Sequence, residues 1–181
     1  VSSTCYDLMQ IRDTLSEFIF SYYYEPVLSE KGDVFFHPDL HTHESCIAEL
    51  ENCQLFLLII GGRFGGSYKF DASKSVTNAE YDAAKINKIP VFTFIKRDVY
   101  EDHRLYQKNK LDVDLVKRIN FPSIEKQEYA ISIFEFIDRV RYSDVNNSIY
   151  PFEYVSQIKE HLGKQWAGLM YDFLVKRVKA N

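Results

Sequence analysis

Residues 55–66 read LFLLIIGGRFGG, and this stretch decides the fold of the 181-residue chain. An apolar run as short as Leu55 to Ile60, followed at once by glycines, predicts a strand buried on both faces, as in parallel sheets. Ile89 to Ile95 repeats the pattern, with Pro90 at its start, where the missing N–H does least harm. Helical patterns precede and separate the two runs. The sequence therefore predicts an α/β fold, with a parallel sheet covered by helices on both faces.

The residues around these strands predict the other elements. Residues 1–4 read as the end of a strand that turns into a helix, with Thr4 and Asp7 at capping-box spacing. A short strand is expected at either 25–29 or 34–36. Helices are expected at 44–52, 78–87, 123–142 and 152–179, and residues 99–120 are expected to be mostly loop with a short helix.

The alternation of strands and helices ends near residue 98, which predicts two parts. Residues 1–98 form an α/β domain with its first strand truncated, and residues 99–181 form C-terminal helices packed on it. The expected helix 152–179 would be roughly 42 Å long, longer than a small domain is wide. Part of its apolar stripe would then overhang and take part in self-association or in contact with a downstream domain. The alternative is a helix packed entirely within the monomer.

Composition excludes several classes of function. The net charge is −4 and no run of lysine or arginine occurs, so nucleic acid is not expected as a partner. The longest apolar run is too short to span a bilayer, and no signal peptide opens the sequence. Cys5, Cys46 and Cys53 form no CxxC pair and are expected to be reduced thiols. These features predict a cytoplasmic protein without membrane contact.

Ligands of open parallel sheets bind beyond the carboxyl ends of the strands, and four segments are expected there. They are residues 2–4, 37–43, 61–66 and 96–98. In the glycine loop, Arg63 offers a planar fork for phosphate or carboxylate, or else pairs with an acidic neighbour.

Glu80 lies at the start of the helix that follows the glycine loop. Its carboxylate either faces the crevice or closes a capping box with Thr77. The spacing alone favours the cap.

Other kinds of site are disfavoured by their missing motifs. The His41-x-His43-Glu44 run lacks a second ligand cluster, so no metal site is expected and the histidines are taken as solvated. The sequence contains no GxGxxG, no GxxxxGK[ST] and no GxSxG.

Four motifs in order resemble one family. VSST with Asp7-Leu8 and Arg12 resembles its opening, and CIAELENCQLFLLIIGGRFG (46–65) resembles its middle. SVTNAEYDAA (75–84) resembles its S-x-T-x-x-E-[YF]-x-x-A helix, and IPVFTFI (89–95) the strand that follows. Over about residues 1–98 the chain thus resembles the domain of unknown function 4062, a TIR-like family found at the front of signalling and defence proteins.

The resemblance implies a flavodoxin-like fold and a site that handles nucleotides. In related TIR and nucleoside deoxyribosyltransferase domains, a helix-borne glutamate attacks or stabilises a ribosyl centre. The matching residue here is Glu80, as the catalytic group. The phosphate or ribose contacts would be Ser2, Ser3, Arg12, Gly61, Gly62, Arg63 and Gly65.

Three functions remain open. The first is an NAD-cleaving hydrolase of the NAD glycohydrolase type, in which Glu80 stabilises an oxocarbenium-like state and NAD is a substrate rather than a tightly bound cofactor. The second is a non-catalytic module that binds a nucleotide or a protein. The third is an enzyme like the nucleoside deoxyribosyltransferases, with Glu80 as covalent nucleophile.

Overall fold

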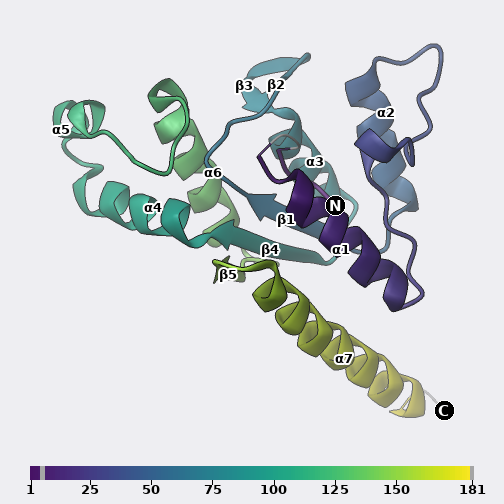
Figure 1. Ribbon diagram of the computed structural model, residues 1–181. Helices are drawn as coiled ribbons and strands as arrows, with labels where there is room; N and C mark the ends of the chain where they lie inside the picture. The colour runs from purple at the N-terminus through teal and green to yellow at the C-terminus, as the bar shows by residue number, and fades with distance from the viewer. Residues whose placement is uncertain (5–6, 180–181) are drawn as a thin grey trace.

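The computed structural model describes residues 1–4 and 7–179, so the expectation about Cys5 lies outside the described residues. Its centre is a parallel sheet of β1 (Phe56–Ile60), β4 (Val91–Lys96) and β5 (Ile149–Phe152), in the order β1-β4-β5 (Figure 1). Ser2 forms a parallel bridge to Leu58 on the other edge of β1, because its N–H donates to Leu57 and its carbonyl accepts from Ile59. The two predicted buried strands and the parallel sheet are confirmed.

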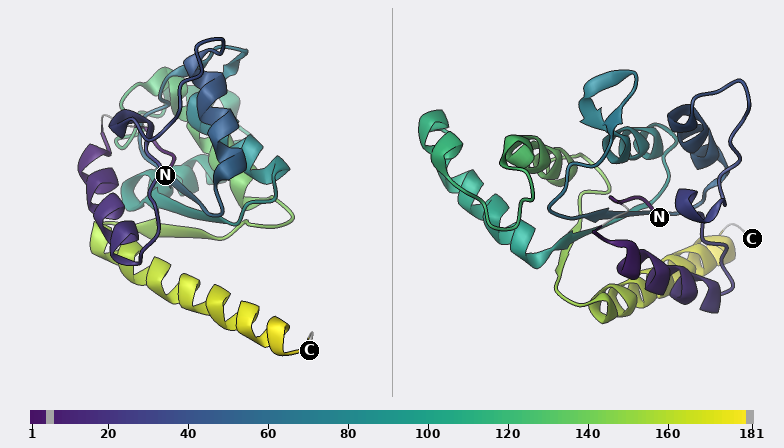
Figure 2. Two further views of the ribbon diagram at one scale, coloured as in Figure 1. Left: turned by 90° about the vertical axis from the view of Figure 1, so that its right-hand side faces the viewer. Right: turned by 45° about the horizontal axis from the view of Figure 1, so that its top comes forward.

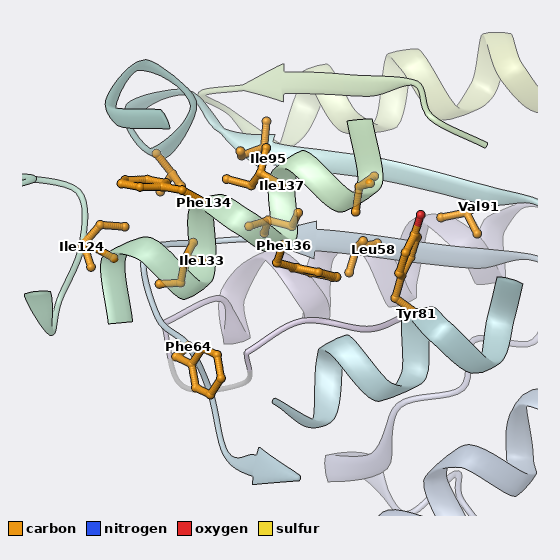
Figure 3. Packing of buried hydrophobic residues seen from close by; sticks show 14 of the residues in the cluster. Leu58, Phe64, Tyr81, Val91, Ile95, Ile124, Ile133, Phe134, Phe136 and Ile137 are labelled. Carbon is orange, nitrogen blue, oxygen red and sulfur yellow. The ribbon is translucent and has the colours of Figure 1, made fainter. Parts of the chain in front are cut away.

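Both faces of the sheet are covered, because successive strand residues point to opposite sides. Leu58 of β1 packs into a cluster with α3 (Val76–Ile86) and α6 (Ala130–Arg141) (Figure 3). Its neighbour Leu57 packs into a second cluster with α1 (Met9–Ser21) and α7 (Val155–Lys179). This is the helix-covered α/β arrangement that the sequence predicts, and it is consistent with a flavodoxin-like fold.

Residues 99–120 are mostly helical, and the prediction of a loop there is wrong. They form most of α4 (Arg97–Asn109) and α5 (Val113–Arg118). The buried residues of α4 are Val99, His103 and Tyr106, which have helical spacing. A polar residue at the centre of the buried stripe breaks the apolar pattern from which a helix would be recognised.

Residues 22–55 contain no strand, so neither predicted strand at 25–29 or 34–36 forms. Leu28 is held in a turn instead, because its N–H donates to Asp33 Oδ2 and its carbonyl accepts from Lys31 N. The short helices here are η1 (Ser29–Lys31), α2 (Thr42–Glu49) and η2 (Leu50–Asn52). A hairpin of β2 (Ser67–Tyr68) and β3 (Asp71–Ser75) precedes α3, and η3 (Gln127–Tyr129) precedes α6.

The sheet and its core continue past residue 98. Residues 99–181 contribute β5, which pairs with β4 from Thr93↔Ile149 to Lys96↔Phe152, as well as helices that cover both faces. This part of the chain, for which only loop and helices were expected, therefore contains a strand. Pro151 and the polar residues before it do not follow the pattern from which a strand is predicted.

The last helix, α7, leaves the body of the molecule. Ile158, Leu162 and Trp166 are buried, whereas Leu169 and the apolar residues after it are exposed. Two views show the end of α7 projecting from the rest of the chain (Figures 1 and 2). Among the described residues, no helix is long and apolar enough to cross a membrane.

Candidate functional site

A cavity of about 660 Å³ lies beside Ser2, on the side of β1 away from β4, and its lining extends from Leu55 before the strand to the glycine loop beyond it. Three of the four segments expected beyond the carboxyl ends of the strands contribute to its lining, and the fourth, residues 96–98, does not. The polar side chains of the lining include Ser2, Ser3, Thr4, Arg12, Glu30 and Glu80, and the apolar ones include Val27, Val34, Phe36, Leu55, Phe56 and Phe64.

Glu80 is not a capping residue, which corrects the expectation from spacing. The helix α3 begins at Val76, and its N-cap is Ser75, whose Oγ accepts a hydrogen bond from Asn78 N at 3.2 Å. Glu80 is thus in the second turn, where a carboxylate has no free helix N–H to accept from. Its Oε2 instead accepts a hydrogen bond from Ser2 Oγ at 2.5 Å, inside the cavity.

Burial raises the pKa of Glu80. The hydrogen bond from Ser2 and the positive charge of Arg12 act in the opposite direction, and the nearby Glu30 carboxylate adds to the increase. Because burial dominates, the Glu80 carboxyl holds its proton to a higher pH than an ordinary glutamic acid.

Arg12 is a buried lining residue that joins several segments around the cavity. Its side chain is only 2% exposed, and its Nε and Nη2 donate to the two oxygens of Glu30 at 2.6 and 2.7 Å. Its Nη1 donates to Ser3 Oγ at 2.9 Å and to the Val1 carbonyl at 3.1 Å. Arg12, which lies in α1, therefore connects η1 to Val1 and Ser3, the residues on either side of the bridge residue Ser2.

Glu30 is a cavity residue that sequence analysis missed. Partial burial acts to raise its pKa, but the two hydrogen bonds and the charge of Arg12 prevail and hold the pKa below its ordinary value. Glu30 and Glu80 thus have pKa values displaced in opposite directions within one cavity. No signal for this pair is present in the sequence, because Glu30 lies in a helix of only three residues, η1, and has no recognisable spacing to Arg12.

Arg63 forms an ion pair, which is the second of the two roles that the sequence left open. Its Nε and Nη2 contact both oxygens of Glu125 at 2.5 and 2.7 Å, at the edge of the cavity. Arg63 and Glu80 line the same cavity.

The glycine loop is clamped to residues 121–129. A Cβ at Gly62 would lie 1.8 Å from the carbonyl oxygen of Ser123, and the Gly62 carbonyl accepts from Glu125 N at 3.0 Å. Phe64 stacks on Tyr129 with ring centroids 4.8 Å apart. Glu125 and Tyr129 are thereby brought to the cavity, from a segment that sequence analysis placed outside the α/β domain.

The other glycines of the loop have different parts. Gly65 has a φ of +83°, in the left-handed region, and lines the cavity. Gly61 and Gly62 lie outside the cavity lining, and a Cβ at Gly61 would lie 2.7 Å from Asp7 Oδ2. Close packing, rather than contact with a ligand, explains these two glycines.

The histidines of the 37–43 segment are structural. His41 caps α2, since its Nδ1 accepts from His43 N while its own N–H donates to Glu44 Oε2. His43 Nδ1 accepts from Lys69 N at 3.1 Å. No group of side chains within residues 1–4 and 7–179 could hold a metal ion.

Two cysteines also line the cavity. Cys46 of α2 and Cys53 after η2 are half-buried and form no disulfide with each other. Burial raises the pKa of the Cys53 thiol, which makes this thiol a poor nucleophile near neutral pH.

These contacts define what the site can do. A carboxyl with a raised pKa and a serine hydroxyl line a partly open cavity that is also lined by apolar side chains. Such a space suits a ligand with hydroxyl groups and a flat apolar ring. Among the described residues, the lysine and arginine side chains of the lining are those of Lys126, Arg12 and Arg63. Both arginines are already paired with carboxylates.

Comparison with known proteins identifies one family. A family model described as Domain of unknown function (DUF4062) matches residues 1–167. The match extends well past the 1–98 range of the resemblance seen in the sequence, and it ends one residue after the buried Trp166 of α7. No curated protein and no solved structure matches the chain.

Proposed function

This chain belongs to the DUF4062 family, and on that premise we propose that it cleaves the N-glycosyl bond of NAD as a TIR-like domain of a cytoplasmic signalling or defence protein. The observation that carries the proposal is the Glu80 carboxyl, hydrogen-bonded to Ser2 Oγ at 2.5 Å within a cavity of about 660 Å³. That volume lies within the range of nucleotide-sized pockets. Glu80 is also the residue that the family motif aligns with a ribosyl-stabilising glutamate.

The proposed reaction is hydrolysis. The bond between C1′ of the ribose and the nicotinamide nitrogen breaks, and its electron pair leaves with nicotinamide. The ionised Glu80 carboxylate stabilises the oxocarbenium-like ribose electrostatically. The hydrogen bond from Ser2 Oγ fixes the orientation of the carboxylate. Water then bonds to C1′ and releases one proton, which gives ADP-ribose.

The test is release of nicotinamide from NAD by the purified chain. We expect release by the wild type and a loss of at least about a hundredfold in Glu80→Gln, the scale for removing a group that stabilises transition-state charge. Glu49→Gln is the matched control, since Glu49 lines the same cavity without contacting Ser2. Equal turnover by Glu80→Gln and the wild type would refute the role of Glu80.

A second function is favoured by the ion pairs. Arg12 and Arg63, which line the cavity, both pair with carboxylates, so a pyrophosphate would have to break these pairs at a cost in free energy or bind at Lys126. This arrangement supports a non-catalytic module that binds a nucleotide or protein. Saturable binding of NAD without release of nicotinamide, in the same assay, would identify it.

A further inference from the structure

The end of α7 is exposed and carries large apolar side chains over most of its circumference, beside a charged stripe that includes Asp172 and Lys176. The exposed apolar residues there include Leu169, Met170, Tyr171, Phe173, Leu174 and Val178. A group of large exposed apolar side chains of this kind usually marks an interaction surface, and the monomer does not cover it. The segment also lies beyond residue 167, where the family match ends.

The exposed helix continues into an aromatic cluster at the end of α1. The rings of Tyr22 and Tyr24 contact the ring of Trp166, with centroids 5.4 and 5.1 Å apart. Leu169 and Met170 follow Trp166 by three and four residues and thus share its side of the helix. We call the continuous surface of Tyr22, Tyr24, Leu169, Met170, Phe173 and Leu174 the tail surface; its members are 41–59% exposed.

We propose that the tail surface binds a second copy of this chain, with the two α7 helices antiparallel. The proposal goes beyond the proposed function and does not depend on it.

The area of the tail surface suits a dimer. Large side chains that are about half exposed offer roughly 80–100 Å² each, so the six together offer about 500–600 Å². The stems of neighbouring lysine and arginine side chains add to this. The total approaches the ~800 Å² that each partner buries in a stable interface.

Charge selects the antiparallel arrangement. The end of α7 carries Asp172, which pairs with Lys176 at 2.6 Å, and then the bases Arg177 and Lys179. In a parallel pair the bases of the two copies would lie side by side and repel. With Phe173 near the two-fold axis, an antiparallel pair places Asp172 of each copy within about a turn of Lys176 of the other, and the helix dipoles oppose.

The first test is the mass in solution, measured by sedimentation and light scattering over a wide range of concentration. We expect the wild type to reach twice 21.3 kDa, and a variant carrying Leu169→Asp and Phe173→Asp to stay at the monomer mass with an unchanged melting temperature. The control is Leu111→Asp, at a residue 97% exposed between α4 and α5, which should dimerise like the wild type. A wild type that stays monomeric, or a double variant that still dimerises, would overturn the proposal.

The second test is cross-linking, which reads the direction of the helices. Phe173→Cys should form a disulfide-linked dimer on oxidation, because residue 173 meets its own copy near the axis. Lys179→Cys should not, because the two copies of residue 179 would be roughly 18 Å apart along the axis, too far for a disulfide. Cross-linking at 179 and not at 173 would contradict the antiparallel arrangement. The wild type, with its native cysteines, measures the background.

Discussion

Replacing Gly62 with alanine should detach the glycine loop from residues 121–129. The new Cβ would lie 1.8 Å from Ser123 O, whereas ordinary contacts begin at 3.4 Å, so the two backbones must separate by about 1.6 Å. The atom in the way is a backbone carbonyl and cannot rotate aside. Gly62 has no positive φ, so the effect is steric and owes nothing to a special backbone conformation.

The cost follows from the contacts that this separation breaks. The hydrogen bond from Glu125 N to Gly62 O contributes about 1 kcal/mol. The stack of Phe64 on Tyr129 contributes roughly another 1 kcal/mol. The half-exposed ion pair of Arg63 and Glu125 contributes about 0.5 kcal/mol. We therefore expect Gly62→Ala to lower the free energy of unfolding by about 2–3 kcal/mol, and the melting temperature by about 5–10 °C.

The assay is thermal and urea unfolding, with a control from the same loop. A Cβ at Gly66 would meet nothing within 4 Å, and its φ is not positive, so Gly66→Ala should unfold within about 0.5 kcal/mol of the wild type. Wild-type stability in Gly62→Ala, or an equal loss in Gly66→Ala, would refute this account of the loop.

Three further predictions concern the caps and buried charges. Ser75→Ala should lower the free energy of unfolding by about 1 kcal/mol, because it removes the N-cap of α3, and Thr77→Ala should lower it much less. A larger loss in Thr77→Ala than in Ser75→Ala, measured by urea unfolding, would show that Thr77 is the cap. Arg12→Met should lower the free energy of unfolding by about 3–5 kcal/mol, because it leaves the Glu30 carboxylate without its partner. This loss of stability should become smaller as the pH falls through the lowered pKa of Glu30, because the carboxylate is then neutralised. A loss that does not change with pH would contradict the pairing. Burial lowers the pKa of His103 despite its hydrogen bond to a carboxylate, so His103 takes up a proton more readily in the unfolded chain than in the folded one. The free energy of unfolding should therefore decrease as the pH falls below about 6.5, and His103→Gln should reduce that decrease. Chemical unfolding at several pH values measures this, and the same pH dependence in the variant and the wild type would contradict the prediction.

The sequence predicted the centre of the fold because that part is coded by local pattern. The apolar runs of β1 and β4 are short, continuous and bounded by glycine or proline, so their length and boundaries identify them. The strand β5 could not be identified in this way. It is short and contains Pro151, and its place in the sheet depends on pairing with β4, about 55 residues earlier in the chain.

The candidate site was predicted in part for a similar reason. Ser2, Arg63 and Glu80 follow or precede predicted elements, so topology brings them to one edge. The partners of Arg12 and Arg63 were not predicted. Glu125, which pairs with Arg63, lies in an irregular segment, and Glu30, which pairs with Arg12, lies in the three-residue helix η1; the positions of both depend on tertiary packing. The role of Glu80 turned on a shift of two residues in the cap of α3, which spacing alone does not resolve.

The pH dependence of nicotinamide release tests the central claim most directly. If the ionised Glu80 carboxylate stabilises the ribosyl centre, the rate should rise with pH, with a midpoint above 4.5, the ordinary pKa of glutamic acid, because burial raises the pKa of Glu80. The Glu80→Gln variant should lose both the rate and this rise, while Glu49→Gln keeps them. No release of nicotinamide at any pH, or the same rising profile in Glu80→Gln, would contradict the claim that this cavity cleaves NAD through Glu80.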